Sequence, residues 1–98
     1  MRPTRHVIRL LQSGRVTIEK RRHLEGGFWG ECDYEYCILY VCRRLCEKTQ
    51  VRVLIHESLH FLNPHEKEAW VRNQEKIVFN SLLPEEFSEL VRMLRKVK

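Results

Sequence analysis

The segment His56-Glu57-Ser58-Leu59-His60 combines residue types and a spacing that suit metal chemistry. It lies in a stretch of helical periodicity, where residues four positions apart are one turn apart and differ by about 40° around the axis. Both imidazoles can therefore reach one metal ion. Glu57 is too close in sequence to bind the same ion, but its carboxylate points along the same rim and can take a proton from water bound to the metal. This HExxH pattern predicts metal-assisted hydrolysis.

A catalytic zinc site needs a third protein ligand and keeps a fourth position open for water. The candidates downstream are His65, Glu66, Glu68 and Glu75. His65 and Glu66 follow Pro64 directly, and a turn there can bring either one back toward the histidines. A carboxylate from a second helix packed against the first leaves the fourth position open, so we favour Glu68. Glu66 and Glu75 are expected to be solvated and stay as alternative ligands.

The helix that carries the pattern is expected over residues 48–62. Its apolar positions form one stripe, made of Val51, Leu54, Ile55, Leu59 and Leu62. The stripe is centred away from His56 and His60, so we expect the histidines to face a cleft while the opposite side packs on the core. The alternative interpretation is a pair of surface histidines that flank Glu57 by chance.

The chain before this helix reads as one helix followed by three short strands. The helix is expected over residues 4–12, with Thr4 as its cap and Gly14 as its stop. The strands are expected at residues 15–20, 28–33 and 36–42. An antiparallel β-meander is the simplest arrangement of three consecutive short strands.

Two more helices are expected after the HExxH helix. One starts between Pro64 and Lys67, and the last opens at Pro84 and runs through Leu94. The composition, 43% hydrophobic and 32% charged, is that of a folded globular protein. We therefore predict a single α+β domain over residues 1–98, because no linker or repeat divides the chain.

The segment from Leu54 to Pro64, followed by Glu68 and Val71, resembles the zincin metallopeptidases of the gluzincin clan. The short chain and the three strands look most like the minigluzincins, which are minimal zincin-like scaffolds. The resemblance covers roughly residues 15–80 and implies a small zinc metallopeptidase that hydrolyses peptide bonds with zinc-bound water.

By this resemblance, His56, His60 and Glu68 would bind zinc, and Glu57 would be the catalytic general base and acid. The substrate, a peptide or protein, would lie along an edge strand. The chain departs from larger gluzincins at Arg72, where an acidic residue often supports a ligand histidine. The resemblance also implies a latent enzyme, because minigluzincins include self-inhibited forms in which a chain end covers the cleft, often across a homodimer. Residues 84–98 are the segment expected to cover the cleft here, with Glu85, Glu86 or Glu89 meeting the metal. The alternative role of that helix is to complete the core.

Residues 1–23 contain seven basic residues and one acidic residue, so this segment accounts for the net charge of +5. A basic segment of this kind can bind nucleic acid. The alternative function is therefore a nucleic-acid-binding or regulatory module with a non-catalytic metal site. The segment lacks the aromatic residues that single-strand binding usually needs, so we favour a solvated charged face.

The four cysteines, Cys32, Cys37, Cys42 and Cys46, do not form a CxxC motif. Two local disulfides are geometrically feasible, but buried thiols are expected in a reducing cytosol. No apolar run approaches the roughly 20 residues that cross a bilayer, and the N-terminus lacks the apolar stretch of a signal peptide. We therefore expect a cytoplasmic protein with no membrane partner.

Overall fold

The computed structural model describes residues 2–98 and contains four α-helices and three strands. In chain order the elements are α1 (Pro3–Gln12), β1 (Thr17–Arg21), the 3-10 turn η1 (Glu25–Gly27), β2 (Gly30–Asp33), β3 (Ile38–Cys42), α2 (Glu47–Leu62), α3 (Glu68–Asn80) and α4 (Pro84–Arg95). The four α-helices and the three strands each lie within a few residues of their expected positions. The α+β class is confirmed.

The ends of α1 follow from local chemistry, although one detail of the prediction is wrong. Pro3 takes the first helical position, where its missing N–H costs nothing. Thr4 is not the cap, because its side chain is fully buried and its hydroxyl lies 3.0 Å from that of Ser81. Gly14 stops the helix as expected, since its φ of +80° is one that other residues rarely adopt.

The predicted β-meander is wrong. The strand order is β1-β3-β2, with β1 parallel to β3 and β2 antiparallel to it. The reason is burial: Leu39 and Val41 of β3 are fully buried, whereas β1 has no buried residue. The most apolar strand therefore takes the centre of the sheet. The long connection through η1 leaves a gap beside β1 that β3 later fills, so β2 becomes an edge strand.

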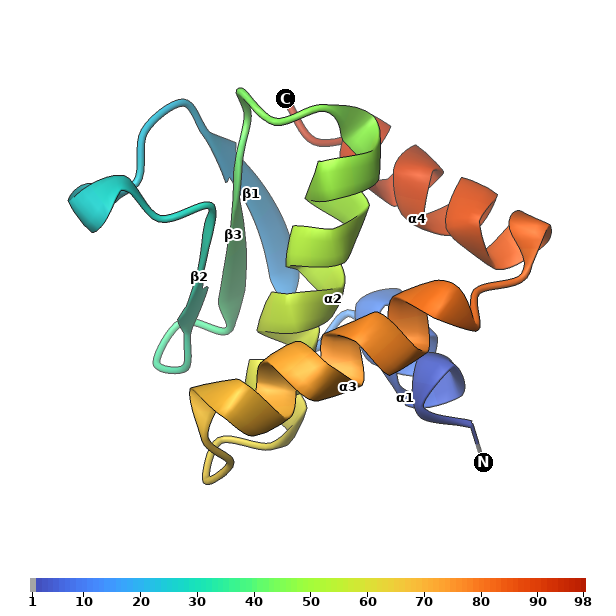
Figure 1. Cartoon of the computed structure of the whole chain (residues 1–98). Helices are drawn as coiled ribbons and strands as arrows, with labels where there is room; N and C mark the ends of the chain where they lie inside the picture. Colours follow the sequence, from blue (N-terminus) through green and yellow to red (C-terminus); the bar gives the residue numbers. More distant parts are fainter. Residues whose placement is uncertain (1) are drawn as a thin grey trace.

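Helix α2 is the centre of the molecule, with the sheet on one side and α4 on the other (Figure 1). The core gathers fully buried side chains from every layer: Leu39 and Val41 from the sheet, Val51, Leu54 and Ile55 from α2, Val71 and Val78 from α3, and Leu90 and Leu94 from α4. Burying each of these side chains stabilises the fold by about 1.5–3 kcal/mol. This core fixes α2 against its neighbours.

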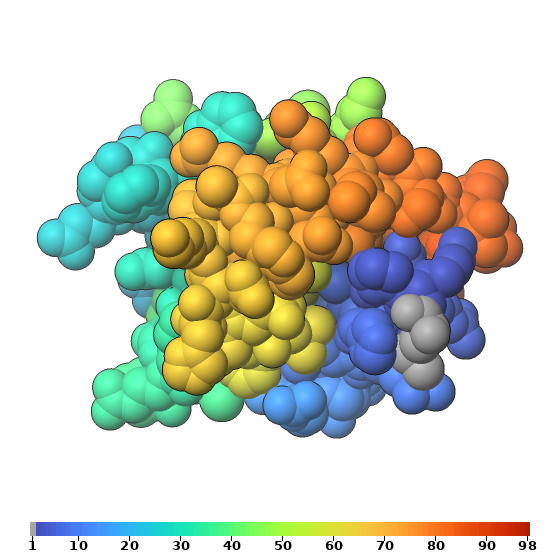
Figure 2. Space-filling model, turned by 60° about the horizontal axis from the view of Figure 1, so that its bottom comes forward, coloured from blue at the N-terminus to red at the C-terminus, as the bar shows by residue number. Residues whose placement is uncertain are grey.

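Helix α3 crosses α2 and covers one face of the molecule, next to α1. Figure 2 shows α3 in orange on that face, with the blue residues of α1 beside it. Within residues 2–98, no helix is both long and apolar enough to span a membrane.

The four cysteines are free thiols in this structure. Cys42 is buried, as expected for a thiol in a reducing environment, and Cys32 and Cys37 are partly buried. Cys46 is exposed at the N-cap of α2, which differs from the expectation of four buried thiols.

Candidate metal centre

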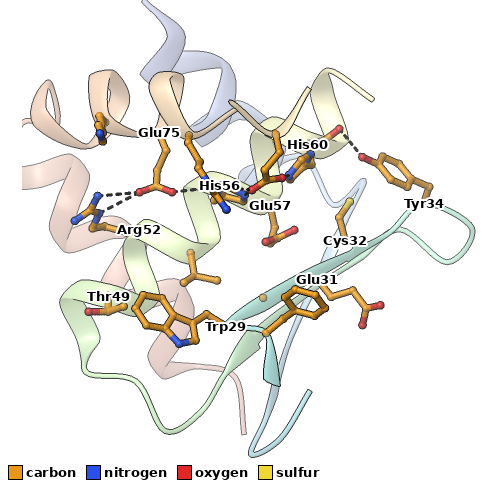
Figure 3. Close-up of a pocket in the computed structure, with 16 residues that line it drawn as sticks. Trp29, Glu31, Cys32, Tyr34, Thr49, Arg52, His56, Glu57, His60 and Glu75 are labelled. Carbon is orange, nitrogen blue, oxygen red and sulfur yellow. Dashed lines mark hydrogen bonds and ion pairs between the residues drawn. The ribbon is translucent and has the colours of Figure 1, made fainter. Parts of the chain in front are cut away.

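His56 and His60 of α2 meet Glu68 of α3. Nε2 of His56 lies 2.8 Å from one carboxylate oxygen of Glu68, and Nε2 of His60 lies 2.7 Å from the other. Both imidazole edges therefore converge on a single carboxylate. Figure 3 shows His56 and His60 side by side on α2, with Glu57 below them and Glu75 next to His56. Burial alone would raise the pKa of Glu68, but the adjacent imidazoles lower it below the usual carboxyl range.

The turn between α2 and α3 brings Glu68 to the histidines. Helix α2 ends at Leu62, and the backbone and side-chain N–H groups of Asn63 donate to the carbonyl of Leu59 at 2.9 and 3.0 Å. The chain reverses over residues 63–67, and α3 starts at Glu68. Glu68 therefore lies in the first turn of a second helix, which is the position that the sequence predicted.

The alternative ligands lie elsewhere. His65 and Glu66 are exposed in the turn between the helices, and neither belongs to the group of donor atoms. Glu75 does reach the site, but not as part of that group. Its carboxylate accepts a hydrogen bond from Nδ1 of His56 at 2.9 Å.

Glu75 therefore supplies a second carboxylate that is hydrogen-bonded to His56. The expectation that Glu75 is solvated is wrong. Arg52 donates to Glu75 through Nε at 3.1 Å and lies 3.0 Å away through its terminal nitrogen. Glu75 follows Glu68 by seven residues, which is two helical turns, so both carboxylates project from the same face of α3. That spacing is the sequence signal that places Glu75 on the face of α3 that carries Glu68. Arg72, by contrast, makes only a 3.5 Å contact with Glu68.

The side chain of Glu57 is 7% exposed and borders the same cleft. Burial raises the pKa of Glu57 to about 7, against a smaller opposing effect of His56. A carboxyl group in this range can both take up and release a proton near neutral pH.

Because Gly30 of β2 has no side chain, there is room beside it for the carboxyl group of Glu57. A Cβ at residue 30 would lie 2.9 Å from Oε2 of Glu57 and 2.4 Å from Cγ1 of Val53. The sequence interpretation did not identify Gly30, because a single glycine in a strand gives no sign of what it faces.

Tyr34, in the turn after β2, contacts the other end of the HExxH segment. Its hydroxyl donates to the carbonyl of His60 at 2.9 Å, and its ring stacks on Phe61. Cys32 lies beside Tyr34 and Glu57, and burial next to the Glu57 carboxyl raises the pKa of its thiol to about 12. The thiol is therefore protonated at neutral pH and is a poor metal ligand.

The cleft has a volume of about 1020 Å³, and the residues that line it all fall within positions 28–76 of the chain. Residues 84–98 are not among its lining residues. Glu86 instead binds Arg2 and the backbone of Leu83, and Glu89 pairs with Arg92. Within one chain α4 completes the core, and coverage of the cleft by a second copy stays a prediction.

The donor set fits a zinc ion. The donor atoms of His56, His60 and Glu68 all lie within 4.8 Å of one another, which an ion with bonds of about 2.0–2.2 Å can bridge after small side-chain movements. Two imidazoles and one carboxylate are a common ligand set of catalytic zinc. The bond from His56 Nδ1 to Glu75 also leaves Nε2 directed at the site.

Comparison of the chain with protein-family models, with curated proteins and with solved structures gave no match. The fold and the site together define an α+β domain with a His/His/Glu group that can hold a metal ion.

Proposed function

We propose that this protein is a small zinc-dependent peptidase with a minimal gluzincin-like site. The observation that carries the proposal is the convergence of His56, His60 and Glu68 beside the buried carboxyl group of Glu57. The three donors would hold the ion. When bound, zinc would supply a Lewis acid that activates water and polarises the peptide carbonyl.

Glu57 carries the proton transfers in this proposal. Its burial raises its pKa to about 7, so it can accept the proton of the attacking water and pass it to the leaving amine. Glu75 holds the ring of His56 from behind, so the histidine does not have to be oriented when the ion binds.

The free edge of β2 supports the binding of an extended peptide. The N–H of Cys42 donates to the carbonyl of Trp29 at 2.8 Å, which marks these residues as a hydrogen-bonded pair of the β2–β3 ladder. Such pairs alternate along antiparallel strands, so the N–H and C=O groups of Gly30 and Cys32 point to the free edge. Both residues line the cleft, so a substrate strand added there would pass the zinc ligands.

Cleavage of fluorescein-labelled casein by the zinc-loaded protein tests this function. We expect wild-type protein to cleave it and Glu57→Gln to lose cleavage while it keeps zinc. The matched control is Glu66→Gln, which changes an exposed glutamate outside the donor group. Equal cleavage by wild-type and Glu57→Gln protein would show that the activity comes from another site or from a contaminant.

Nucleic-acid binding stays the alternative prediction. Several basic side chains of the N-terminal segment have partners within the molecule: Arg2 pairs with Glu86, Arg15 lies over the ring of Phe61, and Arg21 lies over the ring of Tyr40. These contacts explain part of the basic charge without a nucleic acid.

A further inference from the structure

The two walls of the cleft differ in chemistry. On the β2 side, Phe28 and Trp29 are 68% and 61% exposed, although large aromatic side chains are usually buried. They line the cleft next to Val53 and Thr49 of α2. Figure 3 shows the ring of Trp29 on the same side of the site as Thr49 and Arg52, away from Tyr34.

The α3 side of the cleft carries the cations Arg72 and Lys76. They are four residues apart and therefore share one face of the helix. Both are exposed, and Arg72 is 72% exposed. Among residues 2–98, Lys76 makes no ion pair, and the nearest acid to Arg72 is Glu68 at 3.5 Å. If Glu68 binds zinc, its charge is shared with the ion and Arg72 loses most of this interaction.

The other acidic residues of the cleft form no ion pair with these two cations. Glu75 already pairs with His56 and Arg52, and Glu57 is buried. The remaining acid is Glu31 on β2. Gly30 faces α2, because a Cβ there would meet Val53, so the side chain of Glu31 starts from the opposite face of β2. Glu31 forms no ion pair with Arg72 or Lys76.

We propose that the cleft selects acidic peptides, in which an Asp or Glu side chain near the scissile bond binds Arg72 and Lys76 while a neighbouring large apolar side chain packs on Phe28 and Trp29. This selectivity rests on the proposed peptidase function and names the substrate class of the same site. Exposed charge pairs contribute little individually, so two of them predict a preference of about tenfold.

The test uses zinc-loaded Glu57→Gln protein and two short Phe-containing peptides that differ only in carrying Glu or Lys at the charged positions. Calorimetric titration is expected to show about tenfold tighter binding of the Glu peptide, with a ratio that falls as salt is added. In Arg72→Glu/Lys76→Glu protein the preference should disappear or reverse. The control Arg44→Glu/Lys98→Glu makes the same change in net charge at exposed residues outside the cleft and should keep the preference.

Equal affinity for the two peptides, no binding of either, or an unchanged ratio in the Arg72/Lys76 variant would overturn the selectivity. Cleavage of the same peptides by wild-type protein separates this result from the peptidase proposal. Selective binding without cleavage contradicts the peptidase and supports the selectivity. Equal cleavage of both peptides contradicts the selectivity alone.

Discussion

Nδ1 of His56 donates a hydrogen bond to the carboxylate of Glu75 at 2.9 Å. Helix α3 therefore supplies both Glu68, which lies 2.8 Å from Nε2 of the same histidine, and Glu75, which holds the ring from the other side. Because Arg52 pairs with Glu75, α2 in turn fixes that carboxylate. The two helices position the histidine together.

Removing the Glu75 carboxylate should weaken zinc binding. Loss of such a supporting group typically lowers metal affinity by about 10–100-fold, and we expect this range for Glu75→Ala. Competition with a chromophoric chelator measures the affinity. Glu75→Gln keeps the shape and a hydrogen-bond acceptor, so it should recover part of the loss. The same affinity in wild-type and Glu75→Ala protein would refute the positioning role.

A side chain at residue 30 should disturb Glu57 without touching the proposed zinc ligands. The added Cβ of Gly30→Ala would lie 2.4 Å from Cγ1 of Val53 and 2.9 Å from Oε2 of Glu57. Such overpacking costs about 1–3 kcal/mol, so we expect lower stability and weaker cleavage with zinc binding retained.

The double variant Gly30→Ala/Val53→Ala separates the two effects. Removing the Val53 side chain relieves the shorter contact, so stability should rise above that of the single variant while cleavage stays low. Chemical denaturation and the casein assay report the two quantities. Full cleavage by either variant would mean that Gly30 does not set the position of Glu57.

Glu86 links α4 to the N-terminus in a pH-dependent way. Its carboxylate accepts hydrogen bonds from the N–H of Leu83 at 2.9 Å and from Arg2 at 2.7 Å. Burial alone would raise the pKa of Glu86, but these donors lower it below 4.5, the usual value for a glutamate. A lowered pKa in the folded state means that the stabilisation is present above that value and is lost as the pH falls.

Glu86→Gln should therefore destabilise the protein by about 1–2 kcal/mol at neutral pH, with a smaller difference from wild type at about pH 3. Urea denaturation at both pH values checks this. Glu85→Gln, which removes a neighbouring exposed carboxylate from the same helical turn, is the matched control and should have little effect. A loss for Glu86→Gln that is the same at both pH values would contradict the account.

The sequence predicts the helices and the grouping of His56, His60 and Glu68 better than the strand order and the contact of Glu75. Helical periodicity and the Pro84 start are local signals, so they locate α2 and α4 closely. Strand order depends on which strand buries most apolar surface, and the fully buried Leu39 and Val41 decided it through contacts distant in sequence. A local pattern favoured the meander, which the structure replaces with β3 at the centre.

The same distinction holds within the site. Glu68 could be chosen because a second helix is the simplest way to bring a third ligand to HExxH. The seven-residue spacing places Glu75 on the same face of α3 as Glu68, but its contact with His56 depends on the crossing of α2 with α3. The role of Gly30 depends on the approach of β2 to α2, which no spacing along the chain reveals.

The zinc content of the purified protein tests the central claim most directly. After equilibration with zinc above about pH 7 and removal of free metal, we expect about one zinc per chain in the wild type. His56→Ala and Glu68→Ala should retain almost none, and Glu66→Ala should match the wild type. A wild-type protein without zinc, or zinc retained in full by both His56→Ala and Glu68→Ala, would contradict the proposed metal centre.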